Sequence, residues 1–284
     1  MSDTQNQVYG QAYSQNIMQL AQQKYSKLYS TVYMKPNVRG KAFFQDQIGQ
    51  WNMSLKAGRN SQTPNNDPVL GRRMGVMLDY NDNRLLDRTD ELKTISDPRS
   101  AYTIAAAQSL GRQMDDVIIQ NGLLGLAYTG ETGSTTTTAG NITLMSSASM
   151  TLARILAVKQ VFDVNDVEME DRFIVIRPDA LDNLLNTTAF TSSDYSSVKA
   201  LVRGEIDSFL GFKWIMSTRI AAASSSTLIG IAYHRYGVCM AMADAPVVRT
   251  DERTDLSYSW QVYYELNIGA VRLEEARVAV MNEG

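Results

Sequence analysis

Few side chains in the sequence could act as a nucleophile or a general base. It holds one histidine, His234, and one cysteine, Cys239, five positions apart in a segment with the pattern of strand and turn. A serine hydrolase needs a nucleophile beside its histidine, and no G-x-S-x-G motif supplies that serine. A zinc site needs more histidines or cysteines, and a reactive thiol needs positively charged surroundings. We therefore interpret His234 and Cys239 as packed residues.

One stretch has the spacing of a calcium-binding loop. Its acidic and amide residues are Asp79, Asn81, Asn83, Asp87 and Asp90. The sharp turn of such a loop requires glycine, but Arg84 occupies that position, and Asp90 replaces the bidentate glutamate. No helix is predicted before the stretch. We favour a polar joint at the base of a ribbon over calcium binding.

Acidic and glycine-rich segments are equally poor candidates for catalysis. The loop Gly130 to Gly140, GETGSTTTTAG, lacks the lysine that reaches a phosphate, and there is no G-x-G-x-x-G motif. Asp115 and Asp116 are adjacent on a predicted helix, where neighbours diverge by about 100°, so they cannot both face one substrate. Glu274-Glu275 is predicted to be solvated, and Arg72-Arg73 to meet a carboxylate. The sequence therefore predicts no enzyme, no cofactor and no metal.

Composition sets the broad class. The chain has 284 residues, 44% hydrophobic and 20% charged, which suits one large or two ordinary globular domains. A net charge of −3 gives no basic footprint for nucleic acid, and one cysteine allows no intrachain disulfide. No apolar run approaches the ~18 residues of a membrane span, and the N-terminus lacks the blocks of a signal peptide. These features predict a soluble protein made in the cytosol.

The N-terminal region carries the first periodic pattern. From Tyr13 to Tyr33, apolar residues recur at spacings of three and four, which predicts an amphipathic helix that Pro36 ends. The members of this stripe are Tyr13, Ile17, Leu20, Ala21, Tyr25, Leu28 and Val32. Frequent Asn, Gln and Ser indicate an arm, so the stripe should dock on a neighbouring subunit or on a helix of its own subunit.

Two alternating segments flank a polar stretch, residues 57–70, that includes Pro64 and Pro68. The period of two predicts a ribbon of paired strands that projects roughly 30 Å. Its apolar face comprises Trp51, Met53, Leu55, Met74, Val76 and Leu78. An isolated ribbon is marginal in water, so this face should lie on another surface.

The remaining elements follow from capping signals, periodicity and composition. Helices are predicted from Ser96-Asp97-Pro98 to Gly122, over 150–163 and over 179–186. Strands are predicted at 173–176, 212–216 and 258–268, the first fully buried and the last unusually long. Polar loops are predicted at 130–140 and 192–197.

This order of elements resembles the major capsid proteins of tailed bacteriophages, whose fold is shared with encapsulins. Five stretches are also similar locally to that family, from its spine helix to its long return strand and closing segment. They are Ala101–Asn121, Phe173–Asn186, Gly211–Ile220, Tyr233–Pro246 and Tyr258–Met281. The resemblance covers nearly the whole chain from about residue 15.

The resemblance implies an α+β fold of four parts. These are an N-terminal arm at 1–36, an extended β-ribbon loop at 37–80, a peripheral domain at 81–128 and 246–284, and an axial α/β domain at 129–245. The peripheral domain would hold the long spine helix and the long β-strands. The ribbon of this family lies across a neighbouring subunit.

The implied function is structural. The chain would self-assemble as hexamers and pentamers into the icosahedral shell that encloses a phage genome, with the virion as its location and the host cytoplasm as its place of assembly. Members with a built-in scaffold carry a charged helical segment before the arm. Because Met1 here lies close to the arm, a separate scaffolding protein is expected, with a portal and a possible decoration protein. Packaged DNA would be contacted non-specifically at most, and no membrane is expected.

The implied intersubunit contacts are the six ribbon residues named above and three arm residues, Ile17, Leu20 and Leu28. Lys56 lies near the ribbon tip, where some relatives form a covalent crosslink, but no matching partner is recognisable. Two alternatives remain open at this stage: an encapsulin-type compartment that holds a cargo enzyme, and a monomeric enzyme or sugar-binding protein with a polar flap.

Overall fold

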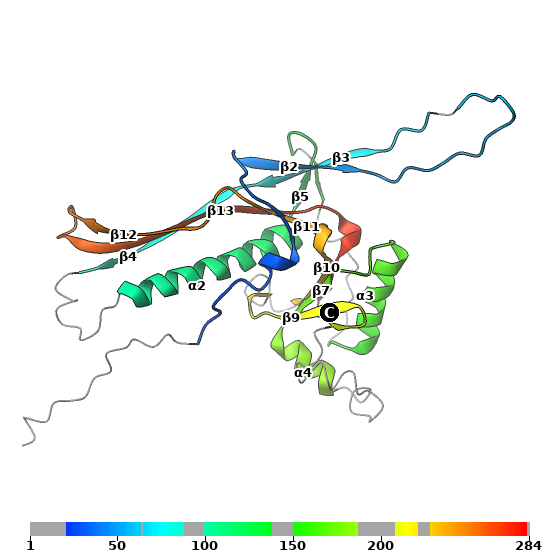
Figure 1. Cartoon of the computed structure of the whole chain (residues 1–284). Helices are drawn as coiled ribbons and strands as arrows, with labels where there is room; N and C mark the ends of the chain where they lie inside the picture. The colour runs from blue at the N-terminus through cyan, green and yellow to red at the C-terminus, as the bar shows by residue number, and fades with distance from the viewer. Residues whose placement is uncertain are drawn as a thin grey trace, which may run out of the picture. The chain divides into compact units, whose positions relative to one another are not determined.

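A computed structural model describes residues 21–63, 65–87, 99–133, 135–137, 150–186, 208–220 and 228–282 (Figure 1). The chain divides into two compact units. The smaller unit comprises Met1–Tyr25, Asp79–Gly111 and Ala245–Leu266, and the larger comprises Ser26–Leu78, Arg112–Asp244 and Asn267–Gly284.

A five-stranded sheet forms one core of the larger unit, in the order β14-β10-β7-β9-β8. Its strands are β7 (Arg172–Ile176), β8 (Ser208–Phe209), β9 (Phe212–Met216), β10 (Leu228–His234) and β14 (Val278–Asn282). Every residue of β7 is buried, which confirms the predicted interior strand. The predicted helices are also present, as α3 (Leu152–Val164) and α4 (Pro178–Asn186). Ring contact between Phe162 and Phe212, with centroids 5.6 Å apart, packs α3 against β9.

A second sheet of the larger unit carries the ribbon. It has the order β2-β3-β5-β6, with β2 at Ala42–Ile48, β3 at Leu70–Val76, β5 at Ala127–Thr129 and β6 at Thr135–Thr137. Near its base, Phe43 is buried and its ring occupies the space above Gly75, where a Cβ would overlap the ring. Glycine at this position therefore lets the aromatic ring cover the ribbon.

Short strands β1 (Tyr33–Lys35) and β11 (Val238–Met242) complete the larger unit together with the end of β13 (Ser259–Arg272). β1 is parallel to β11, and β11 is antiparallel to β13 from Val238↔Arg272 to Met242↔Ile268. Side chains from these strands join those of the ribbon base in one apolar cluster. Its members are Phe43, Met77, Ala127, Cys239, Ala241, Val271 and Leu273.

The predicted long helix is α2 (Arg99–Val117), which continues as the π-helical segment η2 (Ile118–Leu123). The proposed start at Ser96-Asp97-Pro98 lies outside the described residues. The segment ends one residue after Gly122, the predicted stop. Because Ile118, Ile119 and Leu123 are buried, packing holds this last turn in place.

In the smaller unit, long strands pair on both sides of β13. β12 (Val247–Arg253) is antiparallel to β13 from Val247↔Glu265 to Arg253↔Ser259, and β4 (Leu78–Leu86) also pairs with β13. β13 has 14 residues, longer than the predicted strand. The polar joint predicted at residues 79–90 is wrong over 79–86, because these residues form β4, and the Tyr264 hydroxyl donates to Asp82 at 2.8 Å. Asp90 lies outside the described residues.

The predicted arm helix is wrong over its described part. Residues 21–33 hold only one 3₁₀ turn, η1 (Tyr29–Thr31), before β1 begins. The backbone N–H groups of Lys27 and Leu28 donate to the Asp115 carboxylate, each at 3.1 Å, instead of to carbonyls four residues earlier. A side chain distant in sequence has therefore replaced the helical bonds.

The ribbon exists, but its paired strands lie elsewhere than predicted. Residues 51–56 are in no strand, and β2 ends at Ile48, which pairs with Leu70. Continuing that register would place Gln50 opposite Pro68 and Ser54 opposite Pro64. Proline fixes φ at about −65°, whereas an antiparallel strand has φ of about −140°, so prolines at these positions disfavour continued pairing.

Two loop predictions had different outcomes. The loop predicted at 130–140 is wrong in part, because β6 pairs with β5 from Thr129↔Thr135 to Ala127↔Thr137. The β-branched threonines of this segment favour a strand. The loop predicted at 192–197 lies outside the described residues.

Arg172 generates a first testable prediction about the sheet core. Its buried guanidinium lies over the rings of Phe162 and Phe212, bonds the Asp163 carboxylate at 2.7 Å and donates to the carbonyls of Val167 and Glu168. Arg172→Ala removes these donors and leaves a cavity, so it should lower the free energy of unfolding by roughly 3–5 kcal/mol.

Urea unfolding of unassembled subunits measures this loss. Lys213→Ala, which removes a half-exposed ion pair with Asp171 on the same sheet, is the matched control and should cost about 1 kcal/mol or less. Equal losses for both variants would contradict a structural role specific to Arg172.

Candidate functional site

The end of the ribbon exposes large apolar side chains. Met53 is 100% exposed, Leu55 96% and Trp51 72%, and Ile48, Val69 and Leu70 beside them are exposed to a similar degree. Figure 1 shows residues 49–63 and 65–69 as long loop segments that continue from the ends of β2 and β3. Several large exposed apolar side chains in one segment are typical of an interaction site.

Local hydrogen bonds hold the two sides of this tip together without strand pairing. The Gly49 amide donates to the Val69 carbonyl at 2.7 Å, and the Asn66 side-chain amide donates to the Ser54 hydroxyl at 2.7 Å. At the far end, the Ser61 amide donates to the Gly58 carbonyl at 3.3 Å. The apolar side chains therefore lie on a loop whose two sides are joined by hydrogen bonds.

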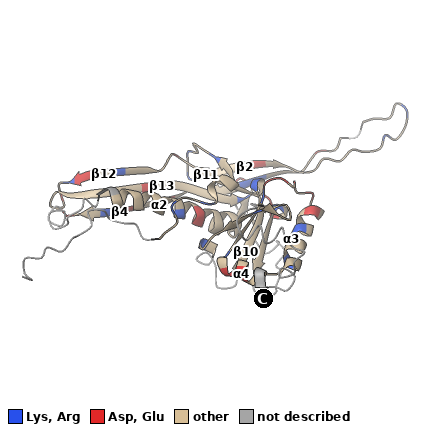
Figure 2. Cartoon of the chain, turned by 60° about the horizontal axis from the view of Figure 1, so that its bottom comes forward, with Lys and Arg blue, Asp and Glu red and all other residues tan. Residues whose placement is uncertain are grey.

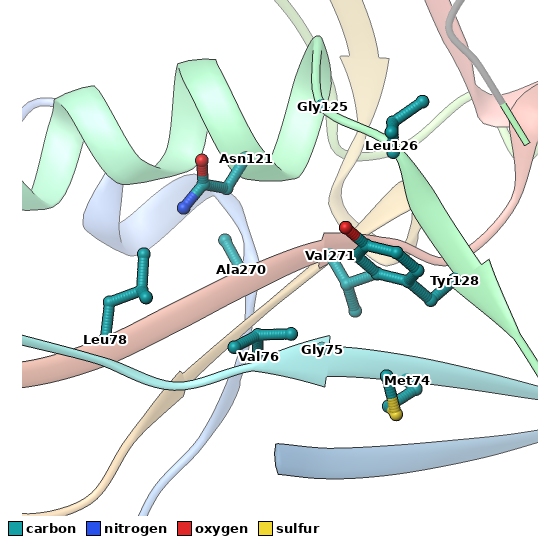
Figure 3. Close-up of a pocket in the computed structure, with 10 residues that line it drawn as sticks. All are labelled: Met74, Gly75, Val76, Leu78, Asn121, Gly125, Leu126, Tyr128, Ala270 and Val271. Atoms are coloured by element: carbon teal, nitrogen blue, oxygen red, sulfur yellow. The ribbon is translucent and has the colours of Figure 1, made fainter. Parts of the chain in front are cut away.

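An apolar groove of about 310 Å³ lies at the base of the ribbon (Figure 3). Val76 and Leu78 line it on one side and Ala270 and Val271 of β13 on another, and Leu126 and Tyr128 come from β5 and the residue before it. Val76, Leu78 and Leu126 are 39%, 40% and 48% exposed. We call this feature the apolar groove.

A second pocket, of about 570 Å³, lies where the ribbon tip begins, and we call it the ribbon pocket. The outer parts of β2 and β3 form one wall, and Glu168, Tyr236 and residues around η5 (Glu275–Arg277) form the other. Arg277 bonds both Glu274 and Glu168, with N···O distances of 2.6 and 3.0 Å. The opening is therefore lined by ion pairs.

Ion pairs also tie the ribbon to the rest of the larger unit. Arg73 bonds Glu275 at 2.6 Å and donates to the Leu273 carbonyl at 2.9 Å. Arg72 bonds Asp46 across the ribbon at 2.5 Å and lowers the pKa of that carboxyl. The prediction that the arginine pair meets carboxylates is confirmed, whereas Glu275 is mostly buried and not solvated as predicted.

The base of the N-terminal arm is anchored by one carboxylate. Asp115 is buried and accepts hydrogen bonds from the Ser26 hydroxyl at 2.5 Å and from two backbone amides of the arm. The neighbouring Asp116 pairs instead with Arg219. The two aspartates thus diverge, as the helical spacing predicts.

The residues that could do chemistry are packed. His234 is buried, accepts from the Tyr236 amide at Nδ1 and has a pKa that burial lowers, so its ring is neutral near pH 7. Burial raises the pKa of the Cys239 thiol to about 12. The interpretation of both as packed residues is confirmed. Within the described ranges, no three His, Cys, Asp or Glu residues converge on a point that could hold a metal ion.

The structure separates the predicted contact residues into groups. Met74, Val76 and Leu78 lie together at the apolar groove, while Trp51, Met53 and Leu55 lie at the tip. Leu28 is completely buried in its own chain, so its assignment to an intersubunit contact is corrected. Ile17 and Leu20 lie outside the described residues. The groove and the ribbon pocket were missed because their walls come from segments far apart in the sequence.

The sequence matches the family described as phage capsid protein over residues 6–282. The chain belongs to this family. The predicted membership is therefore confirmed, and the protein is a structural, shell-forming component of a virion. The alternatives of an encapsulin-type compartment and of a monomeric enzyme or sugar-binding protein are not favoured.

Solved structures share the fold of this capsid protein at low sequence identity. The capsid of the cyanophage P-SCSP1u is 13% identical, with a TM-score of 0.74 over 98% of this chain and 94% of that chain. A Mycobacterium phage Che8 chain is 16% identical, with a TM-score of 0.71 over 96% and 97%. The capsid of Ralstonia phage GP4 is 11% identical, with a TM-score of 0.70 over 97% and 95%. These matches confirm the predicted α+β capsid fold.

No curated protein matches the sequence significantly. Across the portion of the capsid protein that the structure describes, no helix is both long enough and apolar enough to span a membrane.

A second prediction concerns the thiol of Cys239. Because burial raises its pKa to about 12, the group stays protonated near pH 8 and should not react with a maleimide in the native subunit. Mass spectrometry should find no label until denaturant unfolds the chain. Rapid labelling of native subunits would contradict the buried position in β11.

Proposed function

We propose that this capsid protein assembles in the host cytoplasm, as hexamers and pentamers, into the icosahedral shell that encloses a phage genome. The observation that carries the proposal is the exposure of Trp51, Met53 and Leu55 at the end of a ribbon whose own subunit offers them no cover. A side chain of this kind gains roughly 1.5–3 kcal/mol on burial. Most of that gain would appear only when subunits associate, so the function is self-association and not catalysis.

We propose a separate role for each of four parts of the chain. The arm (1–36) and the ribbon (37–80) would bind neighbouring subunits. The peripheral domain (81–128 and 246–284) and the axial domain (129–245) would form the body of the shell. Each copy would bury well above ~2,000 Å² against its neighbours, as permanent assemblies do.

The proposed contact residues are Trp51, Met53, Leu55, Met74, Val76 and Leu78 in the ribbon, and Ile17 and Leu20 in the arm. Contacts between unlike surfaces can close into rings or run on as open arrays. The proposed partners are a separate scaffolding protein, which would bias these contacts toward closure, a portal and a decoration protein. With a net charge of −3, the subunit would contact the packaged DNA non-specifically at most.

Changing Trp51 to Ala tests the shell and the ribbon together. Wild-type protein expressed with its scaffold should elute as particles and show closed shells by electron microscopy. Trp51→Ala should lower the melting temperature of the shells while leaving that of unassembled subunits unchanged, because its ring is exposed until assembly. Calorimetry of both states measures the difference.

Val164→Ala is the matched control for this experiment, since Val164 is equally exposed but lies on α3. Val164→Ala should change the melting temperatures of shells and of unassembled subunits only slightly. Both changes should be smaller than the change that Trp51→Ala causes in shells. Equal destabilisation of shells and subunits by Trp51→Ala would contradict an intersubunit role for Trp51. A wild-type protein that stays monomeric at every concentration would contradict the proposed function itself.

A truncation tests the arm. Deleting residues 1–24 removes Ile17 and Leu20 but keeps Ser26, Leu28 and the bonds to Asp115, so the subunit should fold normally and fail to assemble. Deleting residues 1–10, which precede the apolar stripe, is the control and should leave assembly intact. Circular dichroism and sedimentation measure the two properties. Normal shells from the longer deletion would show that the arm is dispensable.

A further inference from the structure

The ribbon pocket has a mixed character that calls for a particular occupant. Its apolar part includes Ile48 and Val69, both of which are largely exposed. Its rim carries carboxylates from three separate segments: Asp46 of β2, Glu168 and Glu274. A ligand that fits must therefore offer apolar surface together with positive charge.

Carboxylates are the more exposed charges in the lining of the ribbon pocket. The side chains of Asp46, Glu168 and Glu274 are 68%, 58% and 50% exposed. The side chains of Arg73 and Arg277 in the same lining are only 11% and 22% exposed. Arg72, which pairs with Asp46, is 43% exposed but lies outside the lining. Figure 2 shows an acidic position of β2 in red. Three carboxylates against two less exposed guanidinium groups leave the lining of the pocket negative.

Lowered pKa values keep two carboxylates of the ribbon pocket ionised at neutral pH. Hydrogen bonding to Arg72 lowers the pKa of Asp46. A hydrogen bond from its own backbone amide, followed by the charge of Arg277, lowers the pKa of Glu168. Both groups therefore carry negative charge at the rim.

The ribbon tip has the complementary composition. Lys56 and Arg59 are exposed there, directly after Met53 and Leu55. Among the described residues, neither cation forms an ion pair, in contrast to Arg72 and Arg73 nearer the base. Apolar surface followed by positive charge is the combination that the pocket requires.

A subunit cannot place its own tip in its own pocket without folding the ribbon back. The pocket lies beside Ile48 and Gly49, where the tip begins, and Lys56 to Arg59 lie seven or more residues further out. The bonds between Gly49 and Val69 and between Ser54 and Asn66 hold the two sides of the tip together along this length. The occupant must then come from another copy.

We propose that the ribbon pocket of one subunit receives the ribbon tip of the next, with Lys56 and Arg59 facing Asp46, Glu168 and Glu274. This inference rests on the proposed function and names the surface that the tip contacts. The contact joins unlike surfaces, so it repeats head to tail and closes as a ring when the rotation between copies allows. Opposite charges at its rim fix the register and accelerate encounter.

Crosslinking tests this placement. The double variant Arg59→Cys/Glu274→Cys replaces the two ends of a proposed ion pair with thiols. Two such long side chains pair across a distance that is too great for a disulfide, so a short bis-maleimide is used to join the thiols. Native Cys239 contributes no background, because its thiol is buried. Assembled particles should yield a ladder of covalent oligomers ending in closed rings, while each single variant should yield none.

The matched control is Arg59→Cys/Leu126→Cys, which places the second thiol at the apolar groove. A ladder from this control, with none from the first pair, would overturn the proposal and move the tip to the groove. Absence of both ladders in well-formed shells would also overturn it, while leaving the proposed function intact. Failure of the wild-type protein to form shells would instead reject the proposed function.

Charge reversal provides a second measurement. Lys56→Glu/Arg59→Glu should slow assembly by about tenfold or more at low salt and remove most of its salt dependence, since rim charges act mainly on the rate of encounter. Lys213→Glu, at an exposed ion pair on β9, is the control and should leave the rate unchanged. Unchanged rates and salt dependence in the tip variant would contradict the proposal.

Discussion

The ribbon depends on one constraint: two antiparallel strands need cover on a face before they are stable in water. In this protein the cover is supplied only at the base, where the Phe43 ring packs over Gly75 and joins a buried cluster. The Arg72–Asp46 ion pair then joins the two strands, and the Arg73–Glu275 pair ties β3 to the rest of the larger unit. Beyond Ile48 this support ends, and the apolar side chains face solvent.

This division between a supported base and an unsupported tip is what a shell subunit requires. A tip that packed on its own subunit would have no free energy left to contribute to association. Since Trp51 and Met53 remain exposed in the subunit, the proposed contact between copies would supply the hydrophobic gain of burying them. The fold thus supports assembly at the cost of a solvent-exposed apolar surface in the free subunit.

Buried charges serve as anchors elsewhere in the larger unit. Asp115 collects hydrogen bonds from the start of the arm, and Arg172 links a helix, a loop and a strand through its guanidinium. Each charge is buried with partners that satisfy it, as a low-dielectric interior demands. The same burial keeps His234 and Cys239 from acting as a base or a nucleophile.

Elements whose hydrophobic pattern is local could be predicted from the amino acids alone. Alternation predicted β9 and most of β13, a continuous apolar run predicted β7, and helical periodicity predicted α2 and α3. In these segments each residue's neighbours along the chain already decide which face is buried. Together with their order, they were sufficient to indicate the capsid family.

Tertiary structure decided the features that depend on partners distant in sequence. The arm's amides at Lys27 and Leu28 bind Asp115, nearly ninety residues away, so a helical pattern folded as a turn. The strand pairing of the ribbon ended at Ile48 because continuing the same register would place Pro68 opposite Gln50. The ribbon pocket draws its carboxylates from three separate segments, and no local pattern records which of them will meet. Periodicity reports burial along one element, whereas a site is set by which elements pack together.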